Sequence, residues 1–423
     1  MHFFAYKDGR LFCEDAALED IADRFGTPVY VYSATTLERH YKVFEEAFAP
    51  RKVHIAFAMK ANSNVAVLRT LARLGAGADT VSAGEVRRAL AAGIPGAKIV
   101  LSGVGKTRDE LEFALENDVG QINIESEPEM DLLEQVAIDT GRKQAIAIRV
   151  NPDVGAGGHA KITTGKSENK FGVSFETAAR LYARAHKSAH LEPIGVACHI
   201  GSQITDLAPM DAAFRRMTAF AKELRAGGLP LRVLDLGGGL GVPYEGQAEP
   251  PSPKAYADMV QAAIGDLDVE LAFEPGRLIA GNAGVLLSRT IYVKQGDGRK
   301  FLILDAAMND LLRPALYDAY HDIWPVNEAA WNATVETYDV VGPICETGDT
   351  FATARALPEA KPGDLFAFMT AGAYGATMSS TYNSRELAPE VMVKGDQVAL
   401  TKRRMTVEDQ LALEFMPDWL TNS

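Results

Sequence analysis

The feature that most limits how this chain can fold is a series of short apolar, β-rich segments separated by stretches with helical periodicity. Eight such segments occur in the first two thirds of the chain, at 54–59, 76–81, 98–102, 121–124, 145–150, 195–200, 233–236 and 269–273. The stretches between them, such as 82–92, 108–117, 127–140 and 175–189, carry apolar residues near a 3.6-residue period. Strands joined through helices pair in parallel, because the helix carries the chain back across the sheet. The pattern predicts a (β/α)8 barrel, with a doubly wound open sheet as the alternative.

Polar residues follow several of these segments directly, which bears on the choice between the two folds. They are Lys60, Asn151, His199, Ser202, the glycines at 237–239, Glu274 and Arg277. In a barrel the carboxyl ends of all strands meet on one face, where the catalytic groups of such folds lie. An open sheet spreads its strand ends along a line instead. The gathering of polar residues at strand ends therefore favours a closed barrel with a single site.

A different pattern begins after Arg277, where short β-rich segments alternate with glycine-rich turns. The predicted strands are 284–293, 300–304, 335–341, 364–369, 391–393 and 397–402. Such spacing is typical of an antiparallel β-sandwich or barrel. At the N-terminus, 3–6 and 10–13 flank Asp8-Gly9 and predict a hairpin that can join this domain. We therefore expect an α/β chain with a (β/α)8 TIM-like barrel at 28–277 and a discontinuous β domain at 1–27 and 278–423.

Composition excludes several classes of function but does not decide between the two folds. The chain has 43 Lys and Arg against 56 Asp and Glu, a net charge of −13, and shows no basic face for a nucleic acid backbone. Its three cysteines are too few and too scattered for a disulfide framework or a zinc site, so no metal is expected. No apolar stretch reaches the length of a membrane span, and the first residues do not read as a secretion signal. A soluble cytoplasmic protein is expected, with no nucleic acid and no membrane among its partners.

Lys60 is the first candidate for chemistry because it comes directly after an apolar strand. Apolar neighbours desolvate such a lysine, which lowers its pKa and makes the amine a nucleophile. Amines of this kind form Schiff bases with pyridoxal phosphate. The alternative is a strand-end lysine that points to water, and position alone favours this alternative.

Two further motifs follow the last two predicted strands of the barrel. The run 236–241, Leu-Gly-Gly-Gly-Leu-Gly, either points backbone N–H groups at a phosphate or forms a tight turn. Val242 stands where the third glycine of a dinucleotide-binding pattern belongs, so that pattern fails. Glu274 could hold a protonated pyridine nitrogen, and Arg277 could clamp a phosphate or a carboxylate. An ion pair between Glu274 and Arg277 that caps the turn is the alternative.

Three other stretches stay open on residue type alone. His199 can stack on a cofactor ring, with Ser202 donating to the phosphate, or can be a structural histidine. Cys345 lies beside Glu346 and can serve as a proton donor or as a small buried hydrophobe. The stretch 155–170 contains glycine patterns that fail as nucleotide-binding motifs, and is either an active-site loop or a plain surface loop.

Taken together, these residues resemble the fold type III pyridoxal-phosphate-dependent decarboxylases, and within them the diaminopimelate decarboxylase family. The resemblance runs nearly from end to end and rests on motifs that occur in the same order. They lie at 57–62, 82–85, 169–172, 199–203, 237–241, 274–277, 313–317, 345–349 and 371–374. Thr347 stands where the family commonly has serine, and both residues carry a hydroxyl.

The resemblance implies a role for each candidate residue. The implied cofactor-binding residues are Lys60, His199, Ser202, Gly239, Glu274, Gly276, Arg277 and Tyr374, and the implied cofactor is pyridoxal 5'-phosphate. The implied substrate-binding residues are Arg277, Arg313, Tyr317, Glu346 and Tyr374. Lys60 is implied as the covalent anchor of the cofactor, and Cys345 as the proton donor to the carbanion. The family also implies a homodimer with active sites at the interface, where Cys345 and Glu346 reach the site from the partner subunit.

The implied reaction is the decarboxylation of meso-2,6-diaminopimelate to L-lysine and CO2, the last step of lysine biosynthesis by the diaminopimelate route. Arg313 supports this substrate, because a forked cation favours a second carboxylate and repels a simple diamine. One alternative is a decarboxylase of another basic amino acid, of the ornithine, arginine or carboxynorspermidine type. The other is an amino-acid racemase on the same barrel, which needs two opposed bases, of which Lys60 can be one.

Overall fold

The structure is a computed structural model that describes residues 2–155, 170–244 and 249–421. The chain forms two compact units, one made of Leu37–Ala280 and the other of Met1–Thr36 together with Gly281–Ser423. We call them the barrel unit and the β unit. Among the described residues, no helix is long and apolar enough to cross a membrane. The loop expected at 155–170 falls, apart from its two end residues, outside the described part of the chain.

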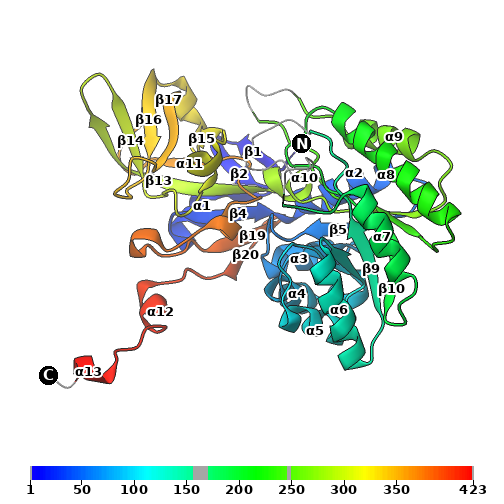
Figure 1. Ribbon diagram of the computed structural model, residues 1–423. Helices are drawn as coiled ribbons and strands as arrows, with labels where there is room; N and C mark the ends of the chain where they lie inside the picture. Colours follow the sequence, from blue (N-terminus) through cyan, green and yellow to red (C-terminus); the bar gives the residue numbers. More distant parts are fainter. Residues whose placement is uncertain (1, 156–169, 245–248, 422–423) are drawn as a thin grey trace. The chain divides into compact units, whose positions relative to one another are not determined.

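Eight parallel strands close into a barrel in the barrel unit (Figure 1). In chain order they are β5 (Val53–Ala58), β6 (Gly77–Thr80), β7 (Ile99–Leu101), β8 (Gln121–Ile124), β9 (Gln144–Arg149), β10 (Leu191–Ala197), β11 (Val233–Asp235) and β12 (Glu270–Phe273). Each strand pairs with the next along the chain, and β12 pairs with β5 to close the ring. The predicted barrel is confirmed, and every observed strand overlaps its predicted segment.

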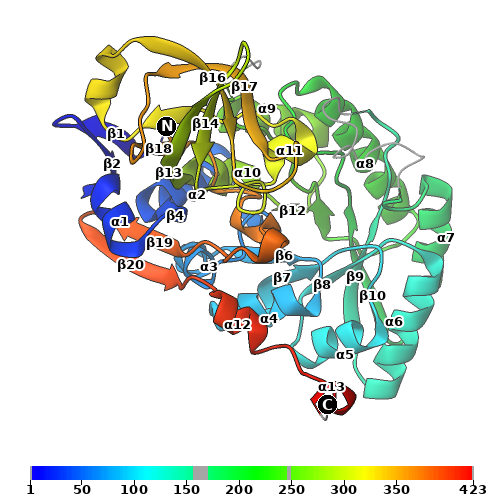
Figure 2. The ribbon, with the colours of Figure 1, turned by 90° about the vertical axis from the view of Figure 1, so that its left-hand side faces the viewer.

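Helices connect these strands outside the barrel, as Figure 2 shows for α4 to α7. They are α3 (Val65–Ala72), α4 (Ala83–Ala91), α5 (Arg108–Glu116), α6 (Glu127–Thr140), α7 (Phe175–Ala185), α8 (Ala208–Ala226) and α9 (Pro253–Ile264). α2 (Ala34–Ala47) precedes the first barrel strand, and α10 (Arg277–Ala280) follows the last one. Several begin after a serine or threonine that caps the helix. The Ser126 hydroxyl, for example, accepts a hydrogen bond from the N–H of Glu129 at 3.3 Å. Such caps satisfy N–H groups that lack a partner inside the helix, and so fix where each helix starts.

The β unit is built on a mixed sheet. Its main path runs through β17 (Thr350–Pro358), β16 (Val335–Val341), β14 (Lys300–Leu304), β13 (Gly284–Gln295), β4 (Val29–Ser33), β19 (Glu390–Lys394) and β20 (Gln397–Lys402), with β18 (Leu365–Phe368) and β15 (Ile323–Pro325) branching from β13. Most neighbours are antiparallel, but β14 with β16 and β4 with β19 are parallel. The second domain is therefore a β domain, as predicted, but its sheet is mixed rather than antiparallel.

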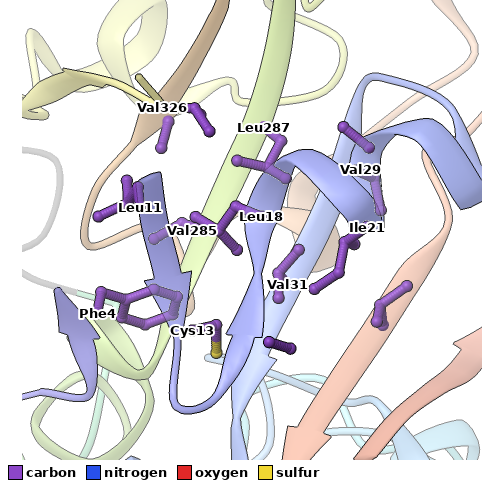
Figure 3. Packing of buried hydrophobic residues seen from close by; sticks show 14 of the residues in the cluster. Phe4, Leu11, Cys13, Leu18, Ile21, Val29, Val31, Val285, Leu287 and Val326 are labelled. Carbon is purple, nitrogen blue, oxygen red and sulfur yellow. The ribbon is translucent and has the colours of Figure 1, made fainter. Parts of the chain in front are cut away.

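The two ends of the chain share one core in the β unit. β1 (Phe4–Lys7) and β2 (Arg10–Cys13) form the predicted hairpin, and with β3 (Ala16–Ala17) they make a small separate sheet. Figure 3 shows Leu11 and Cys13 of this hairpin in one apolar cluster with Val285 and Leu287 of β13. Burial of such apolar side chains is what holds the two distant segments together.

The boundary between the units differs from the position that the sequence pattern indicates. That pattern starts the barrel domain at residue 28, whereas the β unit extends to Thr36. The reason is β4, whose five residues are all buried and pair with β13 on one side and β19 on the other. A run buried on both faces has no alternation that would assign it to one sheet rather than another.

Candidate active site

Lys60 lies just beyond the carboxyl end of β5, where the sequence places it. Its Nζ donates a hydrogen bond to Oδ2 of Asp79 on β6 at 2.9 Å. The Asp79 side chain is fully buried, whereas 39% of the Lys60 side chain is exposed. Lys60 is therefore neither a surface lysine in open water nor a buried one. A carboxylate holds the amine in place while the amine stays accessible to a ligand.

Glu274 follows β12 and is buried. Its backbone N–H donates to the carbonyl oxygen of Gly237 at 2.8 Å, which ties this strand end to the glycine run. Its Oε1 atom is buried and has no hydrogen-bond partner among the described residues. Burial, followed by the nearby carboxylates of Asp235 and Asp79, raises the pKa of Glu274 well above its ordinary value. A buried carboxyl with an oxygen left over is suited to bind a ligand N–H group.

His199 lies two residues beyond the end of β10. Its Nδ1 accepts a hydrogen bond from the backbone N–H of Gly238 at 3.2 Å, so the proton of the neutral ring is on Nε2. Loss of solvation, with the cations of Arg149 and Lys60 adding to it, lowers the pKa of His199 well below its ordinary value. The imidazole is therefore neutral near pH 7, which suits a ring that packs against another ring rather than one that carries charge.

The glycine run after β11 is required by close backbone packing. Gly237 and Gly239 have φ of +65° and +113°, a region that other residues rarely adopt. A Cβ on Gly239 would lie 2.5 Å from the carbonyl oxygen of Gly201, which belongs to the segment that carries His199 and Ser202. Only glycines let this run approach the segment that carries His199 and Ser202. The run can therefore be both a tight turn and a ligand cradle.

Arg277 begins α10 and is buried. Its Nη1 donates to the hydroxyl of Tyr244 at 3.0 Å and its Nη2 to the hydroxyl of Ser202 at 3.4 Å. Gly276, the residue before it, lies against the barrel, where a Cβ would be 3.0 Å from Cβ of Ala61. Arg277, Ser202 and the glycine turns thus form a cationic corner with hydroxyl groups, which is the donor set that a phosphate group takes.

A cavity of about 170 Å³ lies at the carboxyl end of the barrel strands. It is lined by Lys60, Val81, Ser102, Gly103, Asn123, Arg149, Phe171, Ala197, Cys198, His199 and Glu274. Three predicted residues therefore share its wall, and the contacts of His199 and Glu274 with the glycine run connect it to the corner of Ser202, Gly239, Gly276 and Arg277. The barrel unit brings all seven of its predicted site residues together.

Several further residues of this site belong to no motif that marks them in the sequence. Arg149, at the end of β9, pairs with the buried Glu125 at 3.1 Å and lies 4.9 Å from the ring centre of Phe171. Asp79 holds Lys60, and Asn123 lines the cavity. Each of the polar residues lies within or at the end of an otherwise apolar strand, and this departure from the strand pattern was the signal that could have found them.

Arg313 begins α11 (Arg313–Tyr317) of the β unit and is buried. Its Nη1 lies 2.8 Å from Nε2 of His321, and Nδ1 of that ring lies 2.8 Å from the carbonyl oxygen of Met369. Since a guanidinium only donates, Nε2 accepts from Arg313 and Nδ1–H donates to Met369. The histidine therefore fixes one side of the guanidinium. Tyr317, at the end of the same helix, is partly buried.

Cys345 and Glu346 lie in the turn between β16 and β17, and both are exposed. The reading of Cys345 as a small buried hydrophobe is therefore wrong. Buried Asp349 fixes this turn, because its two carboxylate oxygens accept from the N–H groups of Ile344 and Met308, each at 2.7 Å. The exposed thiol and carboxylate are thus presented on a rigid turn rather than on a free loop.

Tyr374, the last predicted site residue, is partly buried in the β unit and has a positive φ of 57°. Such a conformation is uncommon for a tyrosine and is found more often at functional positions. The five β-unit candidates are Arg313, Tyr317, Cys345, Glu346 and Tyr374. Their share in one site with the barrel residues stays a prediction, as do the roles of all twelve. Asn169, in one of the quoted motifs, lies outside the described residues.

Comparison with known proteins identifies the family. Residues 34–281 match the family model described as pyridoxal-dependent decarboxylase, pyridoxal binding domain. The diaminopimelate decarboxylase of Zymomonas mobilis is 49% identical over 423 residues, which are 99% of this chain and 99% of the relative. This chain belongs to the diaminopimelate decarboxylase family. The family member of Pseudomonas aeruginosa is 50% identical over 416 residues, 98% of this chain and 99% of the relative. The predicted family, the enzyme class of decarboxylase and the cofactor pyridoxal 5'-phosphate are confirmed.

Solved structures of the diaminopimelate decarboxylase family share the whole fold. The enzyme of Helicobacter pylori, complexed with L-lysine, has a TM-score of 0.90 and 42% identity over 94% of this chain and 98% of its own. The enzyme of M. jannaschii, in co-complex with L-lysine, has a TM-score of 0.93 and 35% identity over 99% of this chain and 98% of its own. A lysine/ornithine decarboxylase of Vibrio vulnificus, with a TM-score of 0.78 and 21% identity, shows the fold alone.

The residues of the barrel unit fit pyridoxal phosphate. The fit rests on the buried Oε1 of Glu274, which lacks a partner among the described residues, and on the glycine turn, whose space a single Cβ would fill. Lys60 supplies an accessible amine beside them, and Arg277 with Ser202 supplies donors for a phosphate. In the described part of the chain, no group of three or more His, Cys, Asp or Glu side chains is arranged to hold a metal ion.

Proposed function

We propose that this chain decarboxylates meso-2,6-diaminopimelate to L-lysine and CO2, the last step of lysine biosynthesis by the diaminopimelate route. The relatives that cover its whole length are named diaminopimelate decarboxylases, and two of the solved structures hold L-lysine. The observation that carries the proposal is the accessible amine of Lys60 in one cavity with the buried Oε1 of Glu274, which has no partner in the part of the chain that the structure describes.

The barrel residues supply the cofactor half of the chemistry. Bound pyridoxal phosphate supplies an electron sink that stabilises the carbanion left when CO2 departs. Lys60 would hold the cofactor covalently, and Glu274 would keep a proton at the pyridine nitrogen. Neutral His199 would suit a position against the ring, because it carries no charge that the protonated ring would repel. Ser202, Gly239, Gly276 and Arg277 would bind the phosphate.

The residues of the β unit supply the substrate half. Arg313, with Tyr317, Arg277 and Tyr374, binds the carboxylate of the amino-acid centre that does not react, and Glu346 binds the ammonium group beside it. Arg313 is suited to this role because its guanidinium is already oriented by His321 before a substrate arrives. Cys345 then gives a proton to the α-carbon.

We further propose a cytoplasmic homodimer in which Cys345 and Glu346 of each chain complete the site of the other. Both side chains are exposed on a fixed turn, and an exposed thiol gains a defined substrate-facing environment only when another surface covers it. Mixing two variants of low activity tests this arrangement. If Lys60→Ala and Cys345→Ala chains exchange subunits at equal amounts, half of the dimers carry one intact site, and about a quarter of the wild-type activity returns. No recovery after proven exchange would place both residues in the same chain's site.

The reaction is tested by CO2 release from meso-diaminopimelate, with pure protein and added pyridoxal phosphate. Ornithine and arginine serve as parallel substrates, and chiral chromatography of the remaining diaminopimelate detects racemisation. We expect CO2 and L-lysine in equal amounts and little CO2 from the two simpler amino acids. Faster CO2 release from ornithine, or racemisation without CO2, would overturn the proposal in favour of one of the two alternatives.

A further inference from the structure

Two buried carboxyl groups, those of Asp235 and Glu274, lie at the cofactor site. Asp235, the last residue of β11, is 1% exposed. Its Oδ1 accepts from the backbone N–H of Gly237 at 3.0 Å, and its Oδ2 accepts from Nε2 of Gln121 at 3.2 Å. The carbonyl oxygen of the same Gly237 accepts from the backbone N–H of Glu274 at 2.8 Å, so the two buried acids lie at neighbouring strand ends tied to one residue. Two such acids can share one proton, because a protonated carboxyl donates to a charged one.

The surroundings explain why the pair keeps this proton. The other charged or titratable groups around it are Asp79, Lys60, Arg149, His199, Cys198 and Tyr256. Lys60 and Arg149 are the cations, and each is ion-paired with a different carboxylate, at 2.9 Å with Asp79 and at 3.1 Å with Glu125. Two buried acids side by side cannot both ionise at low cost, so one of them stays protonated.

The contacts also indicate which of the two acids holds the proton. Asp235 already accepts from Gly237 and Gln121, and both hydrogen bonds favour its charged form. Glu274 has a buried oxygen without a partner among the described residues. Burial raises the pKa of both acids, that of Asp235 to about 6 and that of Glu274 well above its ordinary value. Because the two accepted hydrogen bonds stabilise the charge on Asp235, Asp235 is the charged member and Glu274 the protonated one.

We propose that Asp235 is a positioning residue that keeps a proton on Glu274 in the cofactor-free site, and that this proton passes to the pyridine nitrogen when the cofactor binds. The step balances within the site. The O–H bond of Glu274 breaks and an N–H bond forms, so the acid pair gains one negative charge and the ring one positive charge. No proton is exchanged with the solvent. The inference rests on the proposed role of Glu274 toward the cofactor, but not on which amino acid is decarboxylated.

The test is the number of protons taken up when pyridoxal phosphate binds to the full-length protein stripped of cofactor. Isothermal titration calorimetry at pH 8, in two buffers with different ionisation enthalpies, gives this number. In Asp235→Asn the charge beside Glu274 is gone, and the amide still accepts from Gly237 and can donate to Glu274, so the pKa of Glu274 falls and more of it is ionised before binding. We expect this variant to take up more protons than the wild type, up to one per site, and its Kd to rise with pH by up to about tenfold per unit where that of the wild type does not. An equal proton number in the two proteins would overturn the proposal.

A matched control and a second measurement separate this role from a structural one. Gln121→Leu removes a contact to the same carboxylate but keeps both acids, so we expect the proton number of the wild type. If Gln121→Leu matched Asp235→Asn, the effect would come from lost packing and the proposal would fail. Infrared difference spectra of the wild type do not depend on whether Asp235→Asn folds. They should show a protonated-carboxyl band that disappears on cofactor binding and is absent in Glu274→Gln, and a band that persists would contradict the proton transfer. None of these readouts uses substrate, so their failure and a failure of the CO2 assay are distinguishable.

Discussion

The two units carry their chemical groups in opposite settings. In the barrel unit, Glu274 and Asp235 are buried and His199 is partly buried, and contacts between neighbouring strand ends fix all three. In the β unit, Cys345 and Glu346 are exposed on a turn. Burial has already shifted the pKa values of the barrel groups, so the electrostatics of the cofactor half are set by this unit itself. The exposed residues instead need a further surface to cover them, which the proposed dimer would supply.

The largest effect that tests this contrast is expected from Lys60. Lys60→Ala removes the amine that binds the cofactor, so we expect the visible absorption band of the lysine-bound cofactor to vanish and turnover to fall by roughly four orders of magnitude or more. Absorption spectroscopy and the CO2 assay measure the two effects. The matched control is Lys98→Ala, which removes an exposed lysine whose contact is the carbonyl oxygen of Gly75. Unchanged colour and activity in Lys60→Ala would contradict the assignment of the whole barrel site.

The next largest effect is expected at Arg313, the buried cation of the β unit. Arg313→Ala should raise KM for diaminopimelate about 100-fold, because a charged hydrogen bond to a desolvated carboxylate is lost. Steady-state kinetics measure it. Arg355→Ala is the control, since Arg355 donates to the backbone oxygen of His321 at 3.0 Å but was not predicted to touch substrate. A similar rise of KM in both variants would mean that Arg313 acts only by holding His321 and its surroundings.

The contrast between the units also explains how far the sequence could predict the structure. The barrel was predictable because each strand is an apolar run that ends in a polar residue, and a closed ring brings those ends together. β4 was missed, since a strand buried on both faces shows no alternation. The parallel pairs in the β unit were missed as well, because strand pairing over long sequence distances leaves no local signal.

The same limit applies to the site residues, whose surroundings in the fold leave no local signal in the sequence. Lys60 and Lys106 both come after strands of the barrel, but only 2% of the Lys106 side chain is exposed, and it donates to Glu129 at 2.5 Å and to two backbone oxygens. No local pattern distinguishes such a structural lysine from an accessible one, and the family motif around Lys60 made the difference. Asp235 and Asp79 were overlooked for a related reason, because their importance comes from burial beside Glu274 and Lys60 rather than from a motif.

A smaller effect on turnover is expected from Cys345. Comparing it with buried Cys13 tests whether the exposed thiol serves the reaction and the buried thiol serves stability. Cys345→Ala should lower kcat about 30-fold by removing a general acid, while the affinity for pyridoxal phosphate stays unchanged. Its free energy of unfolding should change by less than about 0.5 kcal/mol, because the side chain is exposed. Cys13→Ala should instead lower the free energy of unfolding and leave kcat unchanged, since Cys13 is buried in the core of the β unit. Loss of cofactor affinity without loss of kcat in Cys345→Ala would rule out the proton donor.

The smallest effect concerns the pH dependence of stability, and it comes from the barrel unit alone. The pKa of His199 in the folded protein lies well below its ordinary value, so below about pH 6.5 the unfolded chain binds a proton that the folded chain does not. The contribution of this histidine to stability is therefore present above that pH and is lost as the pH falls. Asp235 acts in the opposite direction, because its pKa is raised to about 6, and its contribution grows as the pH falls below that value.

A comparison of variants separates the contribution of His199 to stability from those of Asp235 and His54. Burial also lowers the pKa of His54. Both groups stay in place in His199→Gln, so their pH dependence cancels in the difference. Between pH 7.5 and pH 5.5, urea unfolding of the cofactor-free wild type should lose on the order of 1 kcal/mol more than His199→Gln does. His186→Gln, which changes an exposed histidine at the end of α7, should behave like the wild type. If His199→Gln instead lost as much stability as the wild type, His199 would take up its proton in the folded protein as readily as in the unfolded chain, and the lowered pKa that keeps the ring neutral would be wrong.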